Sequence, residues 1–68
     1  MTKEEAKIYL ESGTQLTHST FLDIEFIGLK KVNEMIFIYD ENGFLLPEKE
    51  FWKYREGSVF DNGWKIFN

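Results

Sequence analysis

The sequence predicts a small α+β fold in which two short helices pack on an antiparallel sheet, in the order αββββαββ. Three observations predict it: a helix-capping pattern opens the chain, apolar runs separated by turn residues fill its middle, and a proline followed by glutamates introduces an aromatic second helix. The 68 residues form one domain, 1–68. A chain of this size buries only about 60% of the surface that its unfolded form exposes.

The first helix is predicted from its capping residues. Thr2 and Glu5 have the spacing of a capping box, in which each side chain satisfies an amide of the first turn. Ala6, Tyr9 and Leu10 then fall on one helical face, with Ile8 at its margin. Gly13 is placed to end the helix in the left-handed conformation.

The middle of the chain predicts strands. Residues 14–18 are rich in threonine and suit a short strand, and residues 21–29 alternate in a way that fits a strand with two partly covered faces. Gly28 indicates a bulge or a close backbone approach. Residues 30–33 form a polar connection, and the apolar run 35–39 is predicted to be the most central strand.

A hairpin is predicted after the third strand. Asn42 and Gly43 favour a tight primed turn, because both residues tolerate positive φ. Residues 44–46 then return as the antiparallel partner.

The last third combines a helix with a second turn. Pro47 suits the first helical position, where its missing donor costs nothing, and Gly57 is the expected end of the helix. Asp61, Asn62 and Gly63 predict a turn between residues 59–60 and residues 64–67, which would form a final hairpin.

Composition limits the function. The net charge of −4 argues against direct nucleic-acid binding, which needs a basic surface. The chain has no cysteine, no apolar run of transmembrane length and no secretory signal pattern, so we expect a cytoplasmic protein without membrane contact. A core this small is commonly supported by oligomerisation, so we expect a homo-oligomer.

Catalytic chemistry finds little support. His18 is the only histidine, so we expect no metal site. It could act as a general base oriented by Asp23 or Glu25, lie partly exposed at the end of a strand, or form a hydrogen bond in a pocket. The glycines form no phosphate-binding loop, and no serine has the glycine spacing of a nucleophile elbow. We therefore expect a protein that is not an enzyme and uses no cofactor.

The aromatic tail is the best candidate for a binding site. Helical spacing brings Trp52 and Arg55 to one side, where the guanidinium can hold a phosphate or carboxylate while a ring stacks on a base. The alternative is that Phe51 and Trp52 belong to the core and Arg55 extends beside them. Trp64 follows a turn glycine, so its ring either borders a pocket or closes the core.

A resemblance extends this interpretation over most of the chain. The stretch EEAKIYLESGTQLTH, Phe21 and the segment Asp61-Asn62-Gly63-Trp64 resemble small phage anti-defence proteins, in particular the Thoeris anti-defence family that sequesters cyclic nucleotide signals. The resemblance implies a homo-oligomer with pockets at subunit interfaces and binding without catalysis. It implies that His18, Phe21 and Trp64 contact the ligand, to which the helical spacing adds Trp52 and Arg55.

Two functions are predicted. The first is a phage-type protein that sequesters a nucleotide-like signalling ligand, with Trp52, Trp64 or Phe21 stacking and Arg55, His18 or Lys65 meeting the anion. The second is an inhibitor or adaptor of the anti-CRISPR or anti-restriction type, which would present acidic residues and exposed aromatic side chains to a host defence protein.

Overall fold

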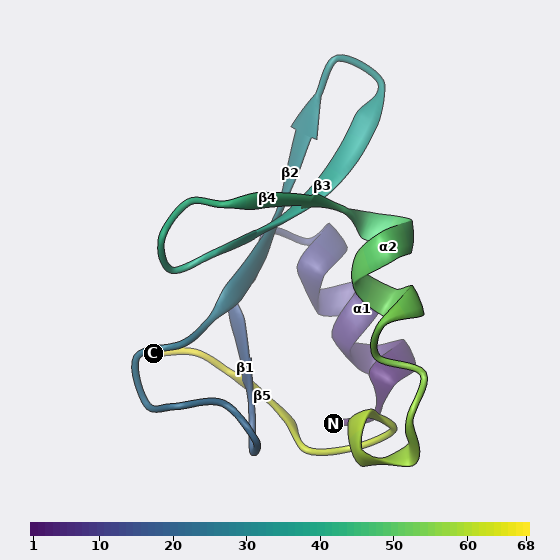
Figure 1. The fold of residues 1–68 in the computed structure, drawn as a ribbon. Helices are drawn as coiled ribbons and strands as arrows, with labels where there is room; N and C mark the ends of the chain where they lie inside the picture. Colours follow the sequence, from purple (N-terminus) through teal and green to yellow (C-terminus); the bar gives the residue numbers. More distant parts are fainter.

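The computed structural model describes residues 1–68 and confirms the α+β class. The elements follow one another as α1 (Lys3–Glu11), β1 (Leu16–His18), β2 (Ile27–Val32), β3 (Met35–Asp40), β4 (Leu45–Pro47), α2 (Glu48–Lys53), the 3₁₀ turn η1 (Ser58–Phe60) and β5 (Trp64–Ile66). All neighbouring strands of the five-stranded sheet are antiparallel, in the order β4-β3-β2-β1-β5. Figure 1 shows α1 and α2 beside each other on one side of the sheet, with the β2–β3 hairpin extending beyond them.

The capping box at the start of α1 is confirmed. The Thr2 hydroxyl accepts a hydrogen bond from the Glu5 amide at 3.2 Å, and the Glu5 carboxylate accepts one from the Thr2 amide at 2.9 Å. Ala6 and Leu10 are buried as expected, so α1 is held by docking as well as by its cap, whereas Tyr9, expected on the same face, is exposed. Gly13 has φ +91° directly after the helix and provides the predicted left-handed end.

The capping box makes the stability of α1 depend on pH. Its hydrogen bonds from Thr2 hold the pKa of the Glu5 carboxyl below its usual value. A lowered folded-state pKa gives stability that is complete above the unfolded-state pKa and is lost as the pH falls through the folded-state pKa. We expect Glu5→Gln to lose this acid-side dependence, because glutamine accepts the same bond without titrating. Urea unfolding measured from neutral pH down to about pH 3 checks this.

The matched control for Glu5 is Glu4→Gln in the same exposed first turn. Glu4 lies 4.0 Å from Lys7 and takes no part in the cap. If Glu4→Gln flattens the pH profile as much as Glu5→Gln does, the capping contact is not the cause.

The second strand lies later in the sequence than predicted. Residues 21–26 form turns and a loop, and β2 continues through Lys30–Val32, which the polarity of the lysines had suggested was a connection. These lysines are exposed on the projecting end of the β2–β3 hairpin, where a strand needs no apolar cover. The chain reverses at Asn33, whose φ of +57° is tolerated by asparagine. In the strand order of the sheet, β2 lies in the middle, where β3 was expected.

The β3–β4 hairpin forms where predicted but with a different turn. Only Gly43 has positive φ (+80°), whereas the primed turn would also need it at Asn42. The Asp40 carboxylate accepts hydrogen bonds from the amides of Asn42 (2.9 Å) and Phe44 (3.1 Å), which favours the wider loop.

The last third departs most from the prediction. Pro47 ends β4 and precedes α2 as its N-cap, and α2 stops at Lys53, before Gly57. Residues 58–60 form the turn η1 and not a strand, so the final hairpin is wrong. β5 instead pairs with β1, placing Trp64 opposite His18. Backbone bonds from Lys3 to Asp61 (3.0 Å) and from Trp64 to Met1 (3.3 Å) join this segment to the start of the chain.

The core lies between the helices and the sheet. Its eight apolar members come from nearly every element, and five partly buried side chains surround them. The eight are Ala6, Leu10, Leu16, Ile27, Ile38, Phe51, Trp52 and Trp64. The aromatic members supply much of the apolar area that so short a chain can bury.

Candidate functional site

Three of the five residues expected to contact a ligand belong to the core. Trp64 is completely buried, His18 is 2% exposed and Trp52 is 9% exposed. The ring of Trp64 lies 4.6 Å from that of His18 and 5.4 Å from that of Trp52, both in edge-to-face geometry. Trp64 therefore has no free ring face for stacking on a ligand, and most of the Trp52 ring is covered by its own subunit.

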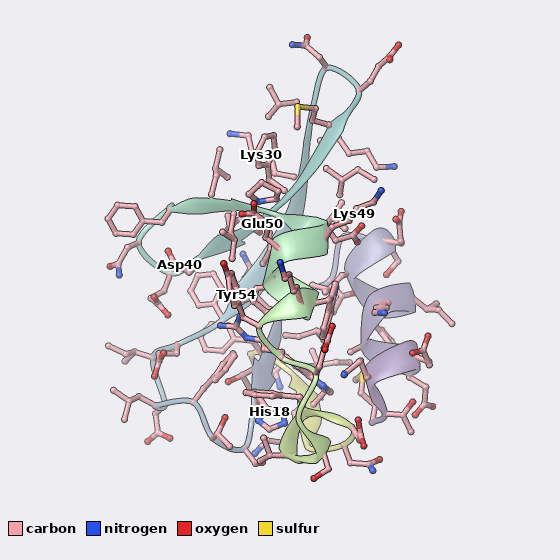
Figure 2. The ribbon with its side chains drawn as sticks, turned by 45° about the vertical axis from the view of Figure 1, so that its right-hand side comes forward. His18, Lys30, Asp40, Lys49, Glu50 and Tyr54 are labelled. Atoms are coloured by element: carbon pink, nitrogen blue, oxygen red, sulfur yellow. The ribbon has the colours of Figure 1, made fainter.

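His18 is fixed in one tautomer by its neighbours. The Thr20 amide donates to Nδ1 at 3.1 Å, so Nδ1 carries no proton, and Nε2–H donates to the Asn62 carbonyl at 2.7 Å. The Thr20 hydroxyl lies 2.9 Å from Nδ1 and completes its environment. Figure 2 shows His18 close to the turn that leads into β5. Neither Asp23 nor Glu25 is a hydrogen-bond partner, so the orientation expected for a general base is absent.

The other two expected residues, Phe21 and Arg55, meet in a cavity of about 300 Å³ that we call the aromatic pocket. It lies between the loop 21–27, the β3–β4 hairpin and α2. In Figure 2 Asp40 and Tyr54 mark this side of α2, away from α1. The lining consists of Phe21, Glu25, Phe26, Ile27, Ile38, Tyr39, Asp40, Glu41, Phe44, Leu45, Leu46, Phe51 and Arg55.

Arg55 is the only cation of the aromatic pocket, and part of its guanidinium has no partner. Its guanidinium carbon lies 3.9 Å from the ring centroid of Phe51, and Nη1 donates to the Phe51 carbonyl at 3.2 Å. Its Nε is buried without any acceptor, and none of the ion pairs in the structure includes Arg55. Burial lowers the pKa of this guanidinium, although an arginine remains protonated in proteins. An acceptor atom from a ligand would satisfy a donor that the chain leaves unpaired.

The three carboxylates of the pocket are already engaged in local structure. Glu25 accepts from the Leu22 amide at 2.7 Å, Asp40 holds the hairpin turn, and Glu41 accepts from the Asn42 side chain at 3.3 Å. They still make the pocket acidic around its one cation. An anion with one negative charge would therefore bind at Arg55 more favourably than an anion with several charges, which the carboxylates would repel.

Several lining residues were not predicted from the sequence. Phe26 and Tyr39 were read only as strand residues, and Phe44 only as part of a hairpin. Gly28 was the one signal in the sequence that could have pointed to Tyr39. A Cβ at position 28 would overlap the ring of Tyr39, its cross-strand partner, so only glycine leaves room for this ring. The expected close approach at Gly28 is thus confirmed, and the Tyr39 hydroxyl accepts from Gln15 at 2.9 Å.

The structure contains no group of three or more His, Cys, Asp or Glu side chains that could hold a metal ion. Neither helix has the length and apolar content needed to cross a bilayer. Comparisons with protein-family models, with curated proteins and with solved structures found no match for the chain. The geometry of the aromatic pocket is therefore the basis for proposing a function.

Proposed function

We propose that this protein binds a flat, aromatic ligand carrying a single negative charge and does not transform it. The observation that carries the proposal is Arg55, a partly buried cation whose Nε is unpaired, in a pocket lined by several phenylalanines. Rings stack on planar ligands, and a guanidinium pairs with phosphate or carboxylate oxygens. Nucleotide-like signals with a phosphodiester group belong to this class.

The charge of the pocket refines the ligand class. Glu25, Asp40 and Glu41 would repel a phosphomonoester, which carries close to two negative charges at neutral pH. A phosphodiester carries one. Cyclic nucleotides are therefore better candidates than nucleoside mono-, di- or triphosphates.

The biological part of the proposal follows the sequence resemblance. The protein would be phage-encoded, act in the host cytoplasm against a defence system and remove its signal by sequestration. A homo-oligomer belongs to this proposal and is supported by large apolar side chains that a single subunit leaves exposed, among them Ile8, Leu22, Ile24, Phe44 and Tyr54.

Cyclic dinucleotides carry two negative charges and are the less favoured comparison in a thermal-shift titration that tests the ligand with a panel of cyclic mononucleotides. We expect at least one to stabilise the protein, and Arg55→Met to weaken its binding about tenfold or more, since a hydrogen bond to a charged group contributes about 1.5–3 kcal/mol. Methionine keeps an apolar stem against Phe51 but removes the guanidinium. Lys30→Met is the control, because it removes the same charge from the exposed end of β2. Binding that is unchanged in Arg55→Met, or stabilisation by no nucleotide, rejects the proposal.

A second candidate function is an inhibitor or adaptor that uses the same side of the molecule. Exposed apolar side chains surround the pocket: Phe44 and Leu45 line it, and Leu22 and Ile24 lie in the adjoining loop. Together with the carboxylates, they complement a partner segment that combines apolar and basic residues.

Selection from a peptide-display library tests this second function. We expect enriched peptides that pair an aromatic or aliphatic residue with Lys or Arg, and we expect Phe44→Ser to abolish their binding. Ile8→Ser is the matched control, since Ile8 on α1 is 69% exposed and Phe44 is 72% exposed. Peptides that bind both variants equally, or that are acidic, count against a partner surface at the pocket.

A further inference from the structure

We propose that a groove between α1 and α2 is a second, separate site that binds a compact, multiply charged phosphate ligand. This lysine groove has a volume of about 410 Å³ and is lined by Lys3, Lys7, Glu48, Lys49, Trp52, Lys53 and Glu56. Four of the chain's eight Lys and Arg residues thus gather in one place, although the protein as a whole is acidic. The groove shares no lining residue with the aromatic pocket.

The lysines of α2 are not neutralised by the protein. Lys49 and Lys53 are four residues apart on the same helix, an arrangement of like charges that opposes helix formation. Neither takes part in any of the ion pairs of the structure. In Figure 2 Lys49 lies on the side of α2 next to α1, whereas Glu50 and Tyr54 lie on the other side. An anion in the groove would relieve this repulsion.

The lysines of α1 face the same groove and are positioned by the fold. Lys3 donates to the Arg55 carbonyl at 2.9 Å and its side chain is only 17% exposed, so its ammonium group is held in place. The Lys7 ammonium group lies 5.2 Å from the ring centroid of Trp52. A cation that is already ordered loses less side-chain entropy when a ligand binds.

Trp52 supplies an independent observation. Its Nε1–H is buried and has no acceptor in the chain, whereas the Nε1–H of Trp64 donates to the Phe60 carbonyl at 2.8 Å. A buried donor without an acceptor is costly, so native structures rarely retain one without a reason. Because Trp52 lines the groove, an oxyanion bound by the lysines would lie next to Trp52, whose indole N–H lacks an acceptor.

The chemistry favours phosphate over a single carboxylate. Lysine ammonium groups act as strongly hydrated point charges that recognise phosphate oxygens without a fixed planar geometry. Two glutamates also line the groove, but the four lysines outnumber them, so the groove attracts an anion with several negative charges more strongly than a single carboxylate. Pyrophosphate or tripolyphosphate can contact lysines of both helices at once.

The test is titration of the ¹⁵N-labelled protein with pyrophosphate and tripolyphosphate at constant ionic strength, followed by NMR. We expect saturable shifts of the Trp52 indole N–H signal, with the paired Trp64 indole as the internal reference. The double variant Lys49→Gln/Lys53→Gln should bind about tenfold more weakly, since each lost charge contact contributes up to about 1 kcal/mol. Lys30→Gln/Lys65→Gln is the matched control, because it removes two charges from exposed positions outside the groove.

The outcomes separate the possible explanations. Equal weakening in both double variants would mean that the protein responds only to net charge, and absence of saturable binding would remove the site altogether. Binding of a tetraglutamate peptide as tight as that of tripolyphosphate would indicate an acidic protein segment and overturn the phosphate assignment. Because Arg55→Met leaves the lysines of the groove intact, this experiment and the nucleotide panel can fail independently.

Discussion

Replacement of Trp64 by alanine should destabilise the protein by about 3–5 kcal/mol, the range found for large aromatic side chains in cores. A domain of this size rarely has more than about 3–5 kcal/mol of stability. The variant should therefore be largely unfolded at room temperature. Circular dichroism and urea unfolding would show this as loss of the cooperative transition.

The expected loss is large because Trp64 joins several parts of the fold. The side chain is completely buried, and its ring contacts those of His18, Phe21 and Trp52. Its Nε1 donates to the Phe60 carbonyl, which fixes η1, and its backbone pairs with His18 of β1. A cavity at this position would weaken the C-terminal strand, the 3₁₀ turn and the sheet together.

A pair of milder substitutions isolates the hydrogen bond. Trp64→Phe removes a bonded indole N–H, whereas Trp52→Phe removes one that has no acceptor. We expect Trp64→Phe to cost about 1 kcal/mol more than Trp52→Phe, the typical net value of such a bond.

Should Trp64→Ala unfold with nearly the wild-type midpoint, the C-terminal strand cannot be an integral part of the core.

Local signals in the sequence determined the parts of the fold that were predicted correctly. The capping box and Gly13 define α1 without reference to any distant residue. The hairpin at residues 40–44 was likewise evident from its turn residues. The bounds of β2 were missed because its lysines lie on a projecting hairpin, where polarity no longer distinguishes a strand from a loop.

The candidate site was predicted only in part because burial depends on distant contacts. Arg55 and Phe21 were identified and do meet in one pocket. Trp64 and His18 also looked like binding residues in the sequence, but they pair with each other across β5 and β1 and are buried. Trp52 is buried on α2 with its ring against that of Trp64. That long-range pairing leaves no local mark, since residues 59–67 read equally well as a hairpin of their own.

Replacement of Gly63 by alanine is expected to be the second most damaging change and to lower the free energy of unfolding by about 2–5 kcal/mol. Gly63 has φ +93°, a conformation that costs a residue with a Cβ about 1–2 kcal/mol. A Cβ there would also lie 2.7 Å from the Ser19 hydroxyl and 3.0 Å from Nε2 of His18. Overpacking of this kind adds about 1–3 kcal/mol.

Gly43→Ala separates the two contributions to this loss. Gly43 has a similar φ of +80°, but no atom lies within 4 Å of its hypothetical Cβ, so only the conformational cost applies. The free energies of unfolding of the two variants, measured in urea, should therefore differ by the cost of displacing the Ser19 hydroxyl and His18, which Asn62 and Thr20 hold in place. In Gly63→Ala the His18 Nε2–H signal should also shift by NMR, and in Gly43→Ala it should not. If both variants lose the same free energy of unfolding and the His18 signal does not shift, the two hydrogen bonds of this imidazole do not hold it rigidly in place.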